Sequence, residues 1–115
     1  MPMKRNEIWW INLDPTVGQE IQKTRPCVIV NDDAIGILPL RVIVPLTDWK
    51  ERYSTADWMV KIEADSQNLL TKASSVDCFQ VRSVSTNRFS HTKGGIIADS
   101  DMRLIERALA IVLKI

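Results

Sequence analysis

Apolar residues along this chain gather in short runs that polar residues interrupt. Runs rich in β-branched and aromatic residues predict strands at residues 7–13, 27–30, 41–46, 58–62 and 74–84. Run 7–13 is mostly apolar on both alternating faces, which is typical of a strand that is central in a barrel or covered by a helix or a partner subunit. Pro45 predicts an edge or a bulge at the end of run 41–46.

The period of the apolar residues changes near residue 100 from two to between three and four. It predicts a helix over residues 100–115, with an apolar row at Met102, Ile105, Leu109 and Val112. We expect this helix to pack on the sheet, and a contribution to a dimer contact is the alternative. Single helical turns are expected at residues 66–70, with Ser66 as N-cap, and at 86–89. The pattern favours a mostly β protein with helices, built as a small barrel.

The length and composition fit one globular domain. The chain has 115 residues, of which 45% are hydrophobic, so we expect a single domain over residues 1–115 with a real core. Its 15 Lys and Arg against 14 Asp and Glu leave a net charge of +1, so any phosphate binding must come from local clustering. No apolar stretch approaches the roughly 20 residues that span a bilayer, so we expect a cytoplasmic protein without a membrane partner.

Cysteine and histidine usage limits the chemistry. Cys27 and Cys78 lie in apolar segments without CxxC spacing, so we expect buried thiols. His91 is the only histidine, which excludes a histidine pair for acid–base catalysis, and no Cys/His cluster predicts a zinc site. The sequence therefore implies no metal and no other cofactor.

A long polar loop, residues 14–24, leads directly into run 27–30, and Arg25 stands at the junction. Pro26 pushes Arg25 toward extended geometry, so the guanidinium should project from a stiff strand start. Gly18 gives the loop mobility, and loops of this length in compact domains are usually functional or disordered. Arg25 is either a charge that solvates a strand end or part of a site.

If the ligand is RNA, the residues at this junction would be sufficient for cleavage. Each ribose carries its own nucleophile, the 2′-hydroxyl, so a cleaving enzyme needs an oriented phosphate and donors for the developing charge. If the strands of Arg25 and Thr47 are antiparallel neighbours, both side chains lie at the same end of the sheet. Taken alone, Thr47 and Asp48 are also ordinary turn residues, and Trp49 is either partly core or a stacking face for a base. Lys23, Lys50 and Arg52 would add local positive potential or are scattered surface charges.

The ordered set DP-x-x-G-x-E, TRP, PLT and FQVRS, from residue 14 onward, resembles the MazF/PemK family of toxin endoribonucleases. The resemblance extends over nearly the whole chain. It implies an SH3-like barrel of the PemK/CcdB type with a C-terminal α-helix, and a homodimer. It also implies metal-independent cleavage of single-stranded RNA at short sequences, leaving a 2′,3′-cyclic phosphate and a 5′-hydroxyl. An antitoxin of the MazE type, with an acidic and partly disordered segment, would neutralise the enzyme.

The same resemblance implies roles for individual residues. It places the catalytic arginine at Arg25 and the catalytic hydroxyl at Thr47. The RNA-binding positions that we expect are Asp14, Gly18, Gln19, Glu20, Lys23, Trp49 and Gln80. Gln19 departs from the serine usual after the loop glycine, and Ile21 from the usual polar residue, so the preferred cut site need not match that of relatives.

Two other functions remain as alternatives at this stage. One is a non-catalytic toxin that binds and poisons DNA gyrase in the manner of CcdB, and the other is a plain SH3-like interaction module. Arg25 with Thr47 argues against both, because a protein that only binds has no need for that pair.

Overall fold

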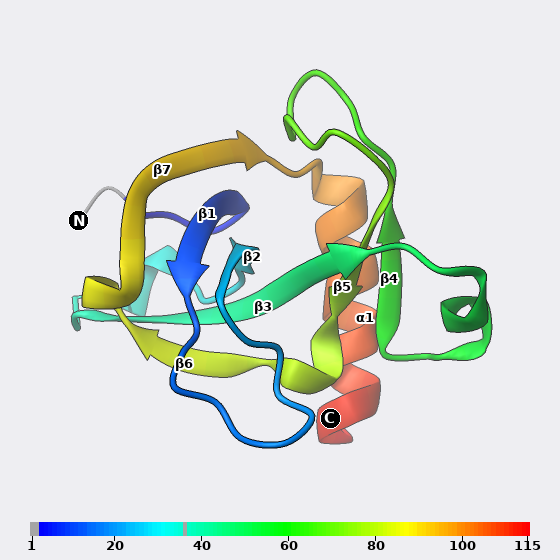
Figure 1. Cartoon of the computed structure of the whole chain (residues 1–115), viewed down its shortest axis with the longest axis horizontal. Coiled ribbons are helices and arrows are strands. Elements are labelled where there is room, and N and C mark those ends of the chain that lie inside the picture. The colour runs from blue at the N-terminus through cyan, green and yellow to red at the C-terminus, as the bar shows by residue number, and fades with distance from the viewer. Residues whose placement is uncertain (1–2, 36) are drawn as a thin grey trace.

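The computed structural model describes residues 3–35 and 37–115, which form an antiparallel β-sheet and one α-helix (Figure 1). The strands are β1 (Glu7–Asn12), β2 (Thr24–Ile29), β3 (Leu40–Asp48), β4 (Met59–Ile62), β5 (Ser74–Asp77), β6 (Arg82–Ser85) and β7 (Phe89–Ile96). Short 3₁₀ helices connect them at η1 (Asp33–Ile35), η2 (Glu51–Thr55), η3 (Cys78–Gln80) and η4 (Thr86–Arg88), and α1 (Asp99–Leu113) follows β7. The predicted class, mostly β with a C-terminal helix, is confirmed.

Strand β3 is the centre of the sheet. The strand order is β4-β5-β3-β2-β1-β7, and β6 pairs with β3 beside β5. The first part of β3 pairs with β6 and its last part with β5, so one long strand joins two parts of a curved sheet. Within the described residues, β4 and β7 are the two ends of this order and do not pair with each other. The sheet is therefore barrel-like in its curvature without being closed, and Figure 1 shows β7 arching around β1.

Three strand predictions need correction. Strand β2 begins at Thr24, so Arg25 and Pro26 lie inside it rather than before it. Pro45 lies within the central strand, opposite Cys27, where β3 passes from its partner β6 to its partner β5. A missing N–H is tolerated there because the ladder on that side changes partner. The predicted strand 74–84 is broken by η3, which the Asp77 side chain caps by accepting from the Phe79 N–H.

Strand β7 has no counterpart among the predicted strands, and it runs through both glycines of residues 94–95. One other local prediction differs from the structure. The turn at residues 66–68 is not a helix capped by Ser66, because Asp65 accepts hydrogen bonds from the backbone of Gln67 and Asn68 at 2.8 and 2.7 Å. The predicted turn at 86–89 is present as η4.

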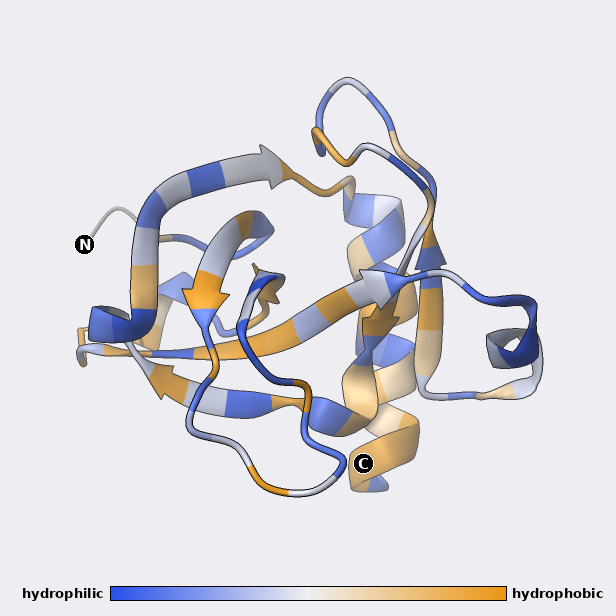
Figure 2. Cartoon of the chain, in the orientation of Figure 1, coloured by the Kyte–Doolittle hydropathy of each residue, from blue (hydrophilic) through white to orange (hydrophobic). Residues whose placement is uncertain are grey.

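Two apolar clusters hold the sheet, one on each face. The larger lies between the sheet and the buried row of α1, which consists of Met102, Ile105 and Ala108. The smaller joins β1, β2, β3 and β6 on the other face through Ile11, Leu13, Cys27, Ile29, Ile43 and Val84. Figure 2 shows the hydrophobic middle of β3, which contributes to both clusters. Because β2 and β3 are covered on both faces, their continuous apolar runs are explained.

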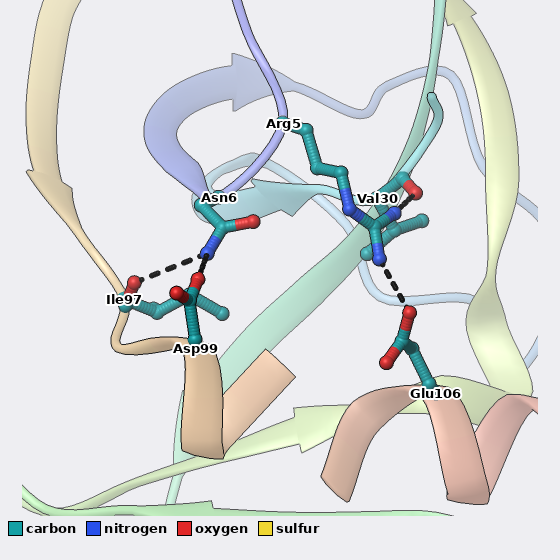
Figure 3. A network of polar contacts seen from close by, with 6 residues as sticks. All are labelled: Arg5, Asn6, Val30, Ile97, Asp99 and Glu106. Carbon is teal, nitrogen blue, oxygen red and sulfur yellow. Dashed lines mark hydrogen bonds and ion pairs between the residues drawn. The ribbon is translucent and has the colours of Figure 1, made fainter. Parts of the chain in front are cut away.

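Polar contacts tie the N-terminal segment to α1 (Figure 3). The Arg5 guanidinium donates to the Val30 carbonyl oxygen and to Glu106 Oε2, the latter at 2.7 Å. Asn6, whose φ is 75°, donates from Nδ2 to Asp99 Oδ1 at 3.1 Å. The side chains of Arg5 and Asn6 thereby fix the segment before β1 to the helix α1.

Both cysteines are buried thiols, as predicted. Burial raises the pKa of each to about 12, so neither is a thiolate near neutral pH. In the described part of the chain, no helix is long and apolar enough to cross a membrane.

Gly95 is predicted to be indispensable for packing. A Cβ atom there would overlap the carbonyl oxygen of Gln67 and the backbone of Asn68. The Gln67 oxygen also accepts a hydrogen bond from the Ile96 N–H of β7. We expect Gly95→Ala to lower the free energy of unfolding by about 3 kcal/mol, the upper end for overpacking, in urea titration. The control is Gly18→Ala, where φ is 59° but the space is open, with an expected loss of about 1 kcal/mol. Equal losses for the two variants would contradict the packing role.

Candidate functional site

Arg25 and Thr47 lie opposite each other on neighbouring strands. β2 and β3 are antiparallel, with Cys27 paired to Pro45, and the same register continued by two residues sets Arg25 opposite Thr47. Facing residues of such a pair have Cβ atoms about 5 Å apart. Both residues are partly exposed, just beyond the last buried pair of the smaller cluster. The two residues predicted to act together are therefore brought together.

Strand alternation places both side chains on the sheet face opposite α1. They share this face with Cys27 and Pro45, since side chains two residues apart lie on the same side of a strand. Asp48, next to Thr47, points to the other face and pairs with Lys72 at 3.0 Å. The Asp48 carboxylate is thereby engaged away from the Arg25–Thr47 pair.

The row that begins at Arg25 continues across two more strands. Thr47 pairs with Ser75, and Ser75 pairs with Lys61, so Lys61 is a second cation on the site face. Its Nζ lies 3.3 Å from Glu63 Oε1 and 5.1 Å above the centre of the Trp49 ring. Trp49 was predicted to stack on a base, but one face of its ring is covered by this ammonium group. Sequence reasoning missed Lys61 because its place in the row depends on the pairing of β4 with β5.

The loop between β1 and β2 is held in shape by its own acidic side chains. Asp14 Oδ1 accepts from the Lys23 N–H at 3.1 Å and closes the base of the loop. Glu20 Oε1 accepts from the Val17 N–H at 2.6 Å across the tip, where Gly18 has a φ of 59°. Both carboxylates expected to bind RNA thus accept hydrogen bonds within the loop.

Arg25 is connected to the same loop. Its Nε donates to the Gln22 carbonyl oxygen at 3.1 Å, which leaves the two terminal nitrogens of the guanidinium on the outer side. The position of the loop therefore influences the direction of the arginine.

Gln80 fastens the loop to η3. Its Oε1 accepts from the Ile21 N–H at 2.6 Å, and its Nε2 donates to the Gln19 carbonyl oxygen at 3.1 Å. Asp77, which caps η3, is buried, and this burial raises the pKa of its carboxyl group above the usual value. Gln80 and the loop residues expected at the RNA groove are thus brought together.

Two cavities flank the site. The larger, of about 370 Å³, lies between the loop and η3 and is lined by Leu13, Gln19, Glu20, Ile21, Pro45, Phe79, Gln80, Val81 and Arg82. The smaller, of about 220 Å³, includes Arg25 and Thr47 among its lining residues, together with Ile8, Trp10, Leu46, Asp48 and the segment 68–72. Pro45 lines the larger cavity and lies on β3 two residues from Thr47, on the same face of the strand. The larger cavity is therefore next to the candidate site.

Phe79 lines the larger cavity and its ring contacts that of Trp58, and sequence reasoning missed this exposed aromatic pair. Phe79 is 65% exposed and Trp58 is 41% exposed. Phe79 stands in an apolar run that predicts a strand, and only the turn at η3 brings its ring to the surface.

This combination defines a class of protein: a small curved antiparallel sheet with one terminal helix, carrying an arginine and a threonine side by side beneath a tethered loop. Residues 4–113 match the family described as PemK-like, MazF-like toxin of type II toxin–antitoxin systems. The chain belongs to this family.

Named relatives agree with this assignment. The chain is 42% identical over 62 residues to the endoribonuclease PemK of Escherichia coli, a match that covers 53% of this chain and about half, 47%, of the relative. It is 28% identical over 123 aligned positions to the endoribonuclease MazF9 of Mycobacterium tuberculosis, covering 98% of both chains.

Solved structures confirm the fold. A mycobacterial endoribonuclease solved in complex with its cognate antitoxin superposes with a TM-score of 0.77 at 21% identity, over 100% of this chain and 97% of the other. MazF from Deinococcus radiodurans gives a TM-score of 0.76 at 19% identity, over 97% and 96%. This chain therefore has the fold of these toxins, as we expected from its sequence.

Replacing Gln80 should release the loop. Gln80→Met keeps the length of the side chain but removes both hydrogen bonds, so we expect the Ile21 amide to exchange at least about tenfold faster in hydrogen-exchange NMR. The control is Gln19→Ala, because the loop contact uses only the backbone oxygen of residue 19. An unchanged Ile21 exchange rate in Gln80→Met would contradict the tethering role.

Proposed function

We propose that this protein is the toxin of a type II toxin–antitoxin system and acts as a metal-independent endoribonuclease on single-stranded RNA. The observation that carries the proposal is that Arg25 and Thr47 line one cavity from the neighbouring strands β2 and β3, next to a tethered loop. Family membership over residues 4–113 and the names of the relatives support it. Residues 1–115 act as a single domain in the cytoplasm, where the RNA substrate is found.

The reaction uses the substrate's own nucleophile. The ribose 2′-oxygen attacks the adjacent phosphorus and loses its proton, while the bond from phosphorus to the 5′-oxygen breaks and that oxygen gains a proton. The products are a 2′,3′-cyclic phosphate and a 5′-hydroxyl. The protein must hold the phosphate and stabilise the additional negative charge that develops on its oxygens.

Arg25 and Thr47 divide this work. The terminal nitrogens of Arg25 donate to phosphate oxygens in the planar geometry that suits them. The attraction between the guanidinium and the phosphate grows as the phosphate oxygens become more negative in the transition state. The Thr47 hydroxyl supplies a further donor from the facing strand. Arginine stays protonated near neutral pH, so stabilisation of charge is the role that its chemistry favours.

Recognition of RNA falls to residues around the pair. Asp14, Glu20 and Gln80 act by shaping the loop, because their side chains are bonded within it or to it. Lys23 and Lys61 add positive charge along the path of the strand. Gly18, Gln19 and Trp49 complete the set of RNA-binding positions, and Gln19 and Ile21 are the positions at which the cut-site preference can differ from that of relatives.

The protein acts as a homodimer and is neutralised by a MazE-like antitoxin. A neighbour of the same fold was solved with its cognate antitoxin, which supports this pairing. An acidic segment that folds on binding would find, on this face, positive charge beside exposed aromatic rings.

Removing either member of the pair should abolish most activity. We expect Arg25→Ala and Thr47→Ala each to lower kcat about 10²- to 10³-fold on a long single-stranded RNA, the usual effect of losing one transition-state donor. Asp48→Ala is the matched control, because this neighbour of Thr47 lies on the other face, and it should stay within a few-fold of the wild type. Near wild-type rates for both site variants would refute the assignment, and gyrase binding without any RNA product would favour the CcdB-like alternative.

The nucleophile can be tested on the substrate. After cut sites are mapped by primer extension, we expect cleavage to persist in excess EDTA. It should stop when the nucleotide 5′ to the cut carries a 2′-deoxyribose, because that substrate lacks the attacking oxygen. The same deoxy substitution two nucleotides away is the control and should be cut. Cleavage at the deoxy position would rule out attack by the 2′-hydroxyl.

A further inference from the structure

Phe79 is a large aromatic side chain that the fold leaves in solvent. Its ring is 65% exposed and meets Trp58 edge to face, with ring centroids 6.0 Å apart and the planes at 75°. Because the edge of one ring packs on the face of the other, part of the Phe79 surface stays open to a further partner. An exposed aromatic pair of this kind is typical of a binding surface.

The position of this pair is fixed by the backbone. Asp77 caps η3 by accepting from the Phe79 N–H at 3.1 Å, and the Cys78 N–H donates to the Trp58 carbonyl oxygen at 2.9 Å. Cys78 between them is buried. Phe79 is therefore presented on a rigid turn, which reduces the ordering that a ligand must impose.

Phe79 forms one wall of the cavity between the loop and η3. Its volume of about 370 Å³ lies within the range of small-ligand sites, and its walls mix apolar surface with the polar residues Gln80 and Arg82. The Arg82 guanidinium is held by donating from Nη1 to the Leu13 carbonyl oxygen at 3.2 Å. A flat ring with polar edges, such as a nucleobase, fits this combination of an aromatic wall and fixed polar groups.

The cavity opens next to the candidate active site. Pro45 lines it and lies on the same strand face as Thr47, two residues away, which is about 7 Å along an extended strand. A nucleotide bound in the cavity can therefore be a close neighbour of the one whose phosphate lies between Arg25 and Thr47. Trp49 is less suited to stacking, because Lys61 covers its ring.

We propose that Phe79, supported by Trp58, is the stacking surface for one base of the RNA substrate, held in the cavity beside the catalytic pair. This role makes Phe79 a determinant of substrate selection and rests on the proposed function. A protein segment could also use exposed aromatic rings. The polar walls and the continuity with the phosphate site favour a base.

The test measures RNA binding and cleavage separately, with the full-length protein. Binding of a fluorescently labelled single-stranded RNA of random sequence is titrated by anisotropy for the wild type, Phe79→Ala and Phe79→Tyr, with Thr47→Ala added to each so that cleavage is slow on the time scale of the titration. We expect Phe79→Ala to weaken binding about 5- to 100-fold, the typical effect of losing one base–aromatic contact, and Phe79→Tyr to retain it. Ile111→Ala is the control, because Ile111 is 59% exposed on α1 and lines neither of the two cavities that flank the site.

Cleavage then shows which base is involved. With Thr47 intact, we expect Phe79→Ala to raise KM more than it lowers kcat and to change the preference for one nucleotide near the cut. Normal cleavage and binding by Phe79→Ala would overturn the stacking role while leaving the proposed function standing. Equal losses in Phe79→Ala and Ile111→Ala would also overturn it.

Two further results would be decisive. Unchanged RNA affinity together with a lower mass for Phe79→Ala in light scattering would assign the ring to a contact between copies of the chain. Absence of RNA binding and cleavage by the wild type would refute both the stacking role and the proposed function.

Discussion

The antiparallel register of β2 against β3 is the constraint on which the site depends. Cys27 and Pro45 are paired and buried, and the residues two places further along each strand are Arg25 and Thr47. A shift of one residue would move one of these side chains to the other face of the sheet. The register is fixed because β2 and β3 are covered on both faces, so a slip would place other side chains into two packed clusters at once. Packing energy and the geometry of the site are therefore set by the same contacts.

The loop and η3 complete the site from outside the central strands. Gln80 holds the backbone of the loop with both ends of its amide group, and the loop in turn accepts a hydrogen bond from Arg25. Asp14 and Glu20 accept hydrogen bonds within the loop, so their charges serve its shape. The face that we propose for RNA is thus built from a rigid pair of strands and an attached loop, with Phe79 and Lys61 extending it in two directions.

Much of this could be predicted from the sequence, and what failed has physical causes. Residues 7–13 and 100–115 were predicted as the correct elements, because β1 places Ile8 in one apolar cluster and Ile11 in the other, and α1 buries one apolar row. The site pair was predicted from the resemblance to the MazF/PemK family and from an assumed antiparallel arrangement of the two strands. Lys61 and Phe79 were missed because their places depend on long-range pairing of β4 and on a 3₁₀ turn inside an apolar run. For Trp49 the sequence left open a core position or a stacking face, because the contact of Lys61 with one face of its ring comes from another strand.

The use of the backbone at residue 19 has a consequence for divergence among such toxins. Gln80 bonds to the carbonyl oxygen of Gln19, so the shape of the loop does not depend on which side chain stands there. A substitution at residue 19 therefore leaves both hydrogen bonds of Gln80 in place, and with them the position of the loop beside Arg25 and Thr47. If the loop contacts RNA as proposed, residue 19 is a position at which such toxins can change their target sequence without loss of folding.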